Sequence, residues 1–257
     1  MGAPLAFITG ASSGIGQALA WRYHQAGYRL ALVARRREEM ERGARERGIP
    51  QADWRAYGAD VGDVESIVAA ARECLAQQGV PEVVVANAGF SIGVDTAERA
   101  DLDVIARIYA VNNVGMAATF HAFIEPMCQR GSGRLVGIAS VGGIRGMPGH
   151  GGYCASKAAV ISYCESLRGE LRGTGVRVVT IAPGYVDTPL TRHNRYPMPF
   201  LMTPEDFADR AFHAIAAGSS YRVIPWQMGL VAKLLRVLPD AWFDRLLAGR
   251  PRKHRGG

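Results

Sequence analysis

The sequence predicts an α/β fold in which about seven parallel strands form one doubly wound sheet with helices on both faces, followed by a short helical extension. Two observations carry this prediction. Short apolar runs alternate with longer segments of helical periodicity along the first 225 residues. One of the apolar runs, residues 176–182, is mostly β-branched, which is typical of a parallel strand buried on both faces.

Each element is placed by its local pattern. The apolar runs place strands at residues 4–9, 28–34, 52–57, 82–86, 133–139, 176–182 and 221–225. The periodic segments between them place helices at residues 14–26, 36–47, 63–78, 101–129, 152–173 and 204–217. Gly27 suits the C-terminal stop of the first helix. Since ligands of open α/β sheets bind beyond the carboxyl ends of the strands, we expect the functional residues there.

The size of the chain favours one domain. A chain of 257 residues that is 48% hydrophobic can bury one substantial core. We expect residues 1–225 to form the sheet domain, residues 226–248 an amphipathic helical extension of it, and residues 249–257 a basic flexible tail. No apolar run is long enough to span a bilayer, and no cleavage signal is apparent, so we expect a cytoplasmic protein.

A glycine-rich turn follows the first strand at residues 9–16. Its glycines, Gly10, Gly14 and Gly16, would let the backbone approach a pyrophosphate whose charge rests on the N-terminus of the next helix. The spacing departs from G-x-G-x-x-G and leaves Ser12 and Ser13 inside the turn. Strand, glycine-rich turn and helix in this order indicate a dinucleotide site, although such a turn alone is also typical of plain loops.

A tyrosine and a lysine are spaced to meet on one helix. Only three lysines occur in the chain, and Lys157 lies four residues after Tyr153, so both side chains would share a helix face. An ammonium beside a phenol favours the phenolate, and we therefore expect Lys157 to lower the pKa of Tyr153 below its usual value of about 10. A surface Tyr/Lys pair is the alternative interpretation.

Taken together, these motifs make the chain similar to the short-chain dehydrogenase/reductase (SDR) family in its compact single-domain form. Residues 9–16 match its TGxxxGxG motif and residues 153–157 its YxxxK motif. Further matches, in the family's order, are the Asn-Ala-Gly turn at 87–89, Asn112 three residues before Gly115, Ser140 at a strand end, and Pro183-Gly184. The resemblance covers roughly residues 4–225 and implies a Rossmann-like fold.

The resemblance also implies that the protein binds a nicotinamide cofactor, and it implies which residues contact that cofactor. They are Gly10, Ser12, Ser13, Gly14, Ile15, Gly16, Arg35, Arg36, Asp60, Val61, Asn87, Ala88, Gly89, Tyr153, Lys157, Pro183, Gly184, Val186 and Thr188.

The charges after the second strand favour NADP over NAD. Arg35, Arg36 and Arg37 stand there, without the carboxylate that would bond the ribose 2′-hydroxyl of NAD. In similar family members a basic residue at the Arg35 position accompanies NADP, whose 2′-phosphate a guanidinium binds bidentately. We expect Arg35 to be the main phosphate contact, with Ser12, Ser13 or Arg36 assisting. The alternative is a solvated basic helix start, but three cations there oppose the helix dipole.

The implied reaction is hydride transfer between the nicotinamide and a carbonyl or secondary alcohol. By resemblance, Tyr153 would protonate the developing alkoxide, Ser140 would donate a hydrogen bond to the same oxygen, and Lys157 would hold the nicotinamide ribose. Asn112 would hold a water that links Lys157 to solvent, and Thr188 would bond the carboxamide. The adjacent Asn113 is an alternative to Asn112.

The substrate side is less specific. We expect the substrate to contact Ser140, Tyr153, His150 and Met147. Residues 185–202 resemble the family's mobile substrate loop, and their apolar side chains, with Ile144 and Pro148, indicate a hydrophobic substrate.

Other functions remain as alternatives. A non-catalytic NADP(H)-binding sensor or scaffold would bind the cofactor without turnover. A hydrolase reading of Ser140 is disfavoured because no G-x-S-x-G elbow surrounds it. We predict no metal site, since the spacing of the four cysteines is not metal-like, and we expect free thiols on helices.

The pattern of the C-terminal region is compatible with more than one contact. Leu230, Val231, Leu234, Leu235 and Leu238 share one helical stripe, and Trp242, Phe243, Leu246 and Leu247 repeat the pattern. We favour a dimer interface or a pocket lid there over peripheral membrane contact, and we expect a homodimer or homotetramer. The net charge of +7 includes four cations in the last eight residues, so we expect a frayed basic tail and no nucleic-acid partner.

Overall fold

The computed structural model describes residues 2–192, 194 and 196–249 and contains the predicted parallel sheet. Its seven strands pair in the order β3-β2-β1-β4-β5-β6-β7, and every pair is parallel. The order reverses between β1 and β4, which makes their carboxyl ends the switch point where ligands of doubly wound sheets bind. The strands are β1 Leu5–Thr9, β2 Arg29–Ala34, β3 Trp54–Gly58, β4 Val83–Ala86, β5 Gly133–Ile138, β6 Val176–Pro183 and β7 Tyr221–Ile224.

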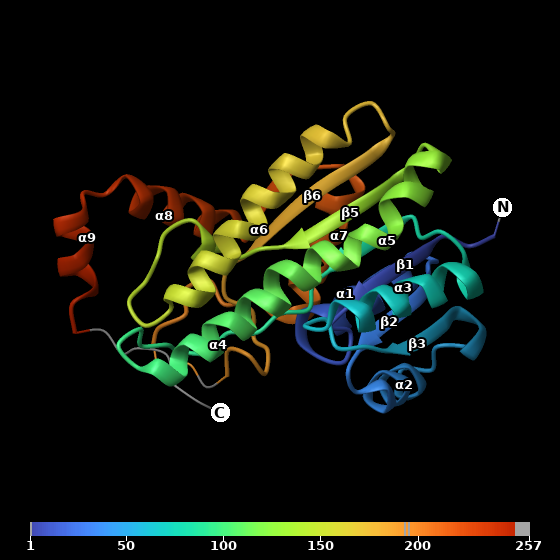
Figure 1. The fold of residues 1–257 in the computed structure, drawn as a ribbon, viewed down its shortest axis with the longest axis horizontal. Helices are drawn as coiled ribbons and strands as arrows, with labels where there is room; N and C mark the ends of the chain where they lie inside the picture. The colour runs from blue at the N-terminus through green and yellow to red at the C-terminus, as the bar shows by residue number, and fades with distance from the viewer. Residues whose placement is uncertain (1, 193, 195, 250–257) are drawn as a thin grey trace.

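Helices cover both faces of the sheet, as Figure 1 shows. They are α1 Gly14–Gln25, α2 Arg37–Glu46, α3 Val64–Gln78, α4 Arg99–Tyr109, α5 Gly115–Arg130, α6 Gly151–Glu170 and α7 Pro204–Ala216. Two more helices, α8 Trp226–Val237 and α9 Asp240–Leu247, follow the last strand. In Figure 1 these two, drawn in red, form the end of the molecule remote from the N-terminus.

The core consists of two apolar layers separated by the sheet. Alternate residues of β1 enter different layers, because successive side chains of a strand point to opposite faces. Ala6 and Ile8 pack with residues of α1, α2 and α7. Leu5 and Phe7 pack with residues of α3, α5 and α6, where the Phe7 and Phe123 rings lie 4.7 Å apart. The predicted fold class is therefore confirmed.

The long helix predicted at residues 101–129 is divided into parts. A π-helical segment, Ala110–Val114, separates α4 from α5. Such a segment inserts one residue into the helical turn and changes which side chains face inward. Here it carries the buried Asn112. The hydrophobic period of a helix hardly changes across one added residue, so the sequence pattern did not reveal it.

Two smaller differences concern the third strand and the C-terminal extension. The predicted strand at 52–57 begins instead at Trp54, because a 3-10 turn, Gln51–Asp53, follows Pro50. In the extension, the apolar stripe expected at a dimer interface or pocket lid is exposed in the single chain: Leu230 and Leu234 face solvent, while Met228, Gly229 and Ala232 are buried. Within the described residues, no helix combines the length and the apolar character needed to cross a bilayer.

Candidate active site

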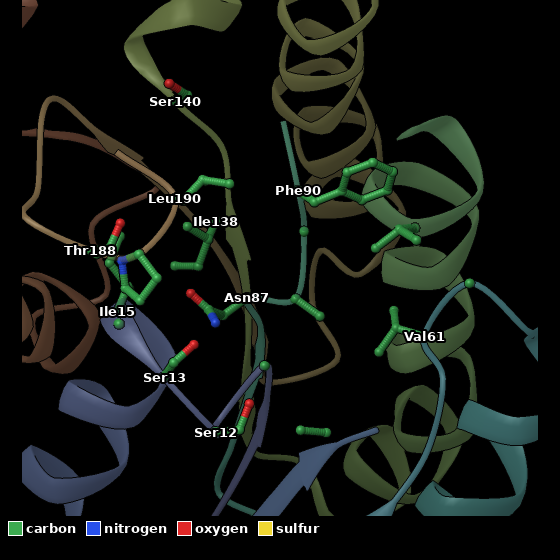
Figure 2. Close-up of a pocket in the computed structure, with 18 of the residues that line it drawn as sticks. Ser12, Ser13, Ile15, Val61, Asn87, Phe90, Ile138, Ser140, Thr188 and Leu190 are labelled. Atoms are coloured by element: carbon green, nitrogen blue, oxygen red, sulfur yellow. The ribbon is translucent and has the colours of Figure 1, made fainter. Parts of the chain in front are cut away.

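A cavity of about 620 Å³ opens at the carboxyl ends of the strands, around the switch point between β1 and β4. It is lined by most of the residues that the sequence analysis assigned to cofactor binding, as Figure 2 illustrates. In that view Ser12 and Ser13 lie at one end, Ser140 lies at the other, and Asn87 lies between them. The predicted cofactor residues in its lining are Gly10, Ser12, Ser13, Gly14, Ile15, Arg35, Arg36, Asp60, Val61, Asn87, Ala88, Gly89, Tyr153, Lys157, Pro183, Gly184, Val186 and Thr188.

The glycine turn is shaped by contacts that leave no room for side chains. Gly10 and Gly14 have φ angles of 69° and 54°, in the left-handed region that favours glycine. A Cβ atom on Gly16 would lie 2.3 Å from the Gly10 carbonyl oxygen, so Gly16 supports the turn from behind rather than lining the cavity. Ser13, the N-cap of α1, makes no side-chain capping bond. The turn thus presents a helix N-terminus to the cavity, which suits a phosphate.

Asn87 fastens the end of β4 to the end of β1. Its side-chain nitrogen donates to the Thr9 carbonyl over 2.9 Å, and the Thr9 hydroxyl accepts from the backbone nitrogens of Asn87 and Ala88, each over 3.0 Å. A Cβ on Gly10 would come within 2.8 Å of the same Asn87 nitrogen. Asn87 and the glycine turn therefore form one rigid floor of the cavity.

The three arginines after β2 have different surroundings. Arg36 pairs with Glu39 over 3.0 Å and Arg37 with Glu41 over 2.9 Å. The first turn of α2 also contains Glu38, so the helix start is less unfavourable than its three cations suggested. Arg35 stands at the strand end with an exposed side chain on the cavity, and it has no ion pair with any described residue. Arg35 and Arg36 both line the cavity, and of these two Arg35 is the one without an ion pair among the described residues.

The opposite wall of the cavity is formed by the turn after β3. The Asp60 carboxylate accepts from the Gly62 backbone nitrogen over 2.9 Å, which fixes the turn. Gly115, at the start of α5, packs against this wall so closely that a Cβ on it would lie 2.1 Å from the Val61 carbonyl oxygen. The N-x-x-G spacing therefore reflects a packing requirement for glycine at this point.

Asn112 lies behind the cavity and not on its surface. Its side-chain oxygen accepts from the Phe90 backbone nitrogen over 3.1 Å, and its side-chain nitrogen donates to the Ser156 hydroxyl over 2.9 Å. A Cβ on Gly89 would lie 2.9 Å from this oxygen and 3.5 Å from the Lys157 ammonium nitrogen. Asn113, in contrast, donates to the Ser156 carbonyl oxygen. Because Asn112 lies beside Gly89 and Lys157, it fits the predicted role near Lys157 better than Asn113 does.

Ser140, Tyr153 and Lys157 share the cavity wall between β5 and α6. Ser140 follows β5, and its hydroxyl accepts from the Gly142 nitrogen over 3.1 Å. Tyr153 and Lys157 lie one turn apart on α6, but the Lys157 ammonium donates to the Ile138 carbonyl over 2.8 Å and lies 5.9 Å from the centre of the Tyr153 ring.

The ionisation of this group differs from the prediction. Burial raises the pKa of Tyr153, with a hydrogen bond from Ser140 acting in the opposite direction. Burial also lowers the pKa of Lys157 to about 8. The expected lowering of the phenol pKa by Lys157 is thus wrong for this structure, because the ammonium is directed to a backbone carbonyl and desolvation of the phenol is the larger effect.

The segment after β6 closes the remaining side of the cavity. Thr188 is buried over the glycine turn, where a Cβ on Gly14 would lie 3.1 Å from its methyl group. Val186 and Met202 form a β-bridge, and the Asp187 nitrogen donates to the Met202 carbonyl over 2.9 Å. The two ends of the predicted substrate loop are therefore hydrogen-bonded to each other, and residues 187–201 lie between them in the sequence.

The two remaining substrate residues do not line this cavity. His150 is buried at the N-cap of α6, and its ring centre lies 5.9 Å from that of Tyr196 in the substrate loop. Met147 is half-buried in the loop before it. Burial, with the charges of Tyr185 and Tyr153 acting in the same direction, raises the pKa of Tyr196 to about 12, so this phenol stays protonated at neutral pH.

Several lining residues had no signal in the sequence. Phe90 directly follows the Asn-Ala-Gly turn, and the Arg107 guanidinium lies 5.4 Å from the centre of its ring. Figure 2 shows Phe90 and Val61 across the cavity from Thr188 and Leu190. The only sequence feature that points to Phe90 is its place directly after the Asn-Ala-Gly turn. Arg107 lies on α4, where only the fold brings it to the cavity.

Known proteins resemble this chain along most of its length. The family model described as short chain dehydrogenase matches residues 4–198. An uncharacterized oxidoreductase of Myxococcus xanthus is 37% identical over 239 residues, which are 93% of this chain and 94% of that protein.

Two solved structures extend the comparison. The 3-ketoacyl-(acyl-carrier-protein) reductase of Brucella melitensis, complexed with NADH, has a TM-score of 0.79 and 28% identity and covers 87% of this chain and 97% of its own. The alcohol dehydrogenase of Thermococcus sibiricus, complexed with 5-hydroxy-NADP, has a TM-score of 0.76 and 28% identity and covers 86% and 95%.

Proposed function

The chain belongs to the short-chain dehydrogenase family of oxidoreductases, and on this premise we propose that it transfers a hydride between NADP(H) and a carbonyl or secondary alcohol. The observation that carries the proposal is one cavity lined by the glycine turn, by Arg35 and by the group Ser140, Tyr153 and Lys157. The glycine turn suits a dinucleotide because it presents the N-terminus of α1 to the cavity. A side chain on Gly10 or Gly14 would be strained and would crowd Asn87 or Thr188. The cofactor, when bound, supplies or accepts the hydride.

The protein's own part in the reaction is proton transfer and positioning. In the reducing direction the Tyr153 hydroxyl protonates the substrate oxygen, and the raised pKa of Tyr153 keeps that proton available at neutral pH. Ser140 donates a hydrogen bond to the same oxygen and stabilises its developing charge. Lys157 holds the nicotinamide ribose. Asn112 is a positioning residue, since its bonds to Phe90 and Ser156 fix the backbone beside Lys157 and support a water path to solvent.

The NADP preference rests on Arg35. Two oxidoreductases of similar fold are complexed with NADH and with 5-hydroxy-NADP, so the fold accommodates both cofactor types. Within this chain the difference between the arginines supports NADP: Arg36 and Arg37 pair with glutamates of α2, whereas Arg35 lines the cavity without such a partner among the described residues. A free guanidinium at the end of β2 suits a 2′-phosphate.

A fluorescence titration with NADPH and NADH tests this proposal. We expect the wild type to bind NADPH more tightly, and Arg35→Ala to lose about 10- to 100-fold in NADPH affinity, as expected for charged hydrogen bonds. NADH affinity should change little. Arg36→Ala is the matched control and should retain the preference. Equal binding of both cofactors by the wild type would overturn the choice of NADP, and binding of neither would overturn the enzyme assignment.

Substrate class and cellular setting follow from weaker support. The apolar side chains of the substrate loop, with Phe90 and Leu190 in the cavity, support a hydrophobic substrate. All four cysteines lie on helices as free thiols, which supports a reducing cytoplasm. The homodimer or homotetramer stays a prediction.

A further inference from the structure

An apolar face is exposed on the C-terminal helices. The side chains of Trp226, Leu230, Leu234 and Val237 are 63 to 77% exposed, and their spacing places them on one side of α8. Trp242, on α9, is 68% exposed. Large apolar side chains gathered in this way are unusual on a soluble surface and mark a contact site.

This face is directed away from the body of the protein. The opposite side of α8 consists of small or flexible residues, Met228, Gly229 and Ala232, which are buried. A Cβ on Gly229 would lie 3.1 Å from Val223 of β7, so the helix packs very closely on the sheet edge. No described residue of α8 or α9 lines the active-site cavity. The exposed side is therefore neither core nor pocket lid.

Arg145 holds the two helices in place. It lies in the loop after Ser140, with only 12% of its side chain exposed. Its guanidinium donates to the Leu235 and Leu238 carbonyls at the end of α8, bonds the Asp240 carboxylate over 2.8 Å, and lies 3.8 Å from the centre of the Phe243 ring. These contacts satisfy helix-end carbonyls that would otherwise lack partners. The apolar face is thus preformed.

The charge of the same region indicates the partner. Residues 226–257 of the sequence hold seven Lys and Arg and two Asp, a net charge of +5 of the chain's total of +7. Three of these cations and both aspartates lie on α8 and α9, and the other four cations follow in the sequence at residues 250–255. Lys233 and Arg236 flank the apolar side of α8. Self-association through this face would bring two such charges together, which disfavours a second copy. A nucleic acid would leave the apolar side chains exposed to water.

We propose that α8 and α9 form a membrane-surface site that binds an anionic lipid bilayer. An apolar helix side with tryptophans and flanking cations is the composition that lies in the headgroup region of a bilayer. Each cation near an anionic surface strengthens binding about fivefold. Figure 1 shows the site at the end of the molecule where α6 begins and where the loop after β5 lies, so it borders the substrate side.

Vesicle cosedimentation tests the proposal. The full-length protein is mixed with phosphatidylcholine vesicles with or without phosphatidylglycerol, at low and high salt. We expect it to sediment with the anionic vesicles and to be released by salt. Leu230→Gln with Leu234→Gln should reduce binding at least tenfold. Val64→Gln with Leu102→Gln, which replaces two exposed apolar residues elsewhere, should bind like the wild type.

A second pair of variants isolates the charge. Lys233→Gln with Arg236→Gln should weaken binding to anionic vesicles by about 25-fold, at about fivefold for each cation. Arg72→Gln with Arg172→Gln removes two exposed cations elsewhere and should change binding little.

Two controls separate this proposal from the others. NADPH titration of every variant checks that the sheet domain is intact, and its failure in the wild type would concern the proposed function and not this site. Light scattering after size exclusion measures oligomeric state. Absence of vesicle binding by the wild type would overturn the proposal, as would a dimer that the Leu230/Leu234 variant converts to monomers.

Discussion

The two ends of this chain solve different packing problems. In the cofactor half, formed by the elements from β1 to α6, glycines mark the points where backbones approach too closely for any side chain, as between Gly16 and Gly10. In the C-terminal extension, α8 also packs through a glycine, Gly229, but its larger apolar side chains face solvent. Function in the first region depends on an internal cavity, whereas the second region presents an external surface. Whether a residue is buried therefore depends on how closely its neighbours approach, and not on its hydrophobicity alone.

The largest expected difference between the two regions is in catalytic rate. Tyr153→Phe should lower kcat by about 100- to 10,000-fold on any carbonyl substrate that the protein reduces, because the general acid is lost. NADPH affinity should be retained. Trp242→Gln in the extension should leave kcat with a soluble substrate unchanged. Steady-state assays on a carbonyl panel make the measurement. A wild type that reduces no member of the panel but binds NADPH would favour the sensor alternative.

The packing of the glycine turn should give the largest effect on stability. Gly16→Ala places a methyl group in contact with the Gly10 carbonyl and Asn87, so we expect the free energy of unfolding to fall by about 3 kcal/mol. Gly146→Ala is the control, because nothing lies within 4 Å of its added Cβ, and it should change stability by less than about 0.5 kcal/mol. Urea unfolding followed by circular dichroism measures both. Equal effects would contradict the close approach.

Substitution of two arginines that bind backbone carbonyls allows the local stability of the two regions to be compared directly. Arg145 holds the extension, while Arg130 donates to the Pro81 and Val80 carbonyls before β4. Arg145→Gln should speed hydrogen exchange in α8 and α9 by about tenfold, the equivalent of about 1.4 kcal/mol, and leave the β4 region unchanged. Arg130→Gln should do the reverse. Exchange that rises throughout the chain in either variant would show that the two regions open together.

The smallest effect concerns pH. Lys157 is protonated below its pKa of about 8, and a ligand held by the ammonium binds that form. NADPH affinity should therefore be constant below that value and fall by a few fold as the pH rises through it. Lys157→Met should bind more weakly and show no such change. Fluorescence titrations on both sides of pH 8 measure it, and an affinity that rises with pH would contradict the assignment.

The cofactor half could be predicted because its motif glycines are required where two backbones approach closely. Gly10, Gly14 and Gly16 are required by backbone contacts, and their spacing is visible in the sequence. The π-helical segment at Asn112 was not predictable, since one added residue scarcely alters the helical period. The 153–157 spacing placed Tyr153 and Lys157 on one helix, but it could not reveal that the ammonium is directed to the Ile138 carbonyl.

The extension was harder to interpret because apolar periodicity identifies a helix without showing which side is covered. The more apolar stripe, with Leu230 and Leu234, was expected to form a dimer interface or a pocket lid, and it is exposed in the single chain. Small residues pack the other side against β7, where close approach matters more than side-chain size. Arg145 lies about ninety residues earlier in the chain than its partners, so only the fold could connect them. The basic tail predicted at 249–257 lies outside the described residues from residue 250 onward.

The bridge between Val186 and Met202 has a consequence for protein engineering. Because it joins both ends of the substrate loop, the loop's length is uncoupled from the geometry of the cofactor floor. Each doubling of a loop's length costs only about 0.6 kcal/mol in closure entropy. Loops of other lengths and compositions can therefore be grafted after Thr191, whose hydroxyl donates to the Val186 carbonyl. Selection for new substrates can then act on residues 192–201 while Thr188, β6 and α7 keep their places.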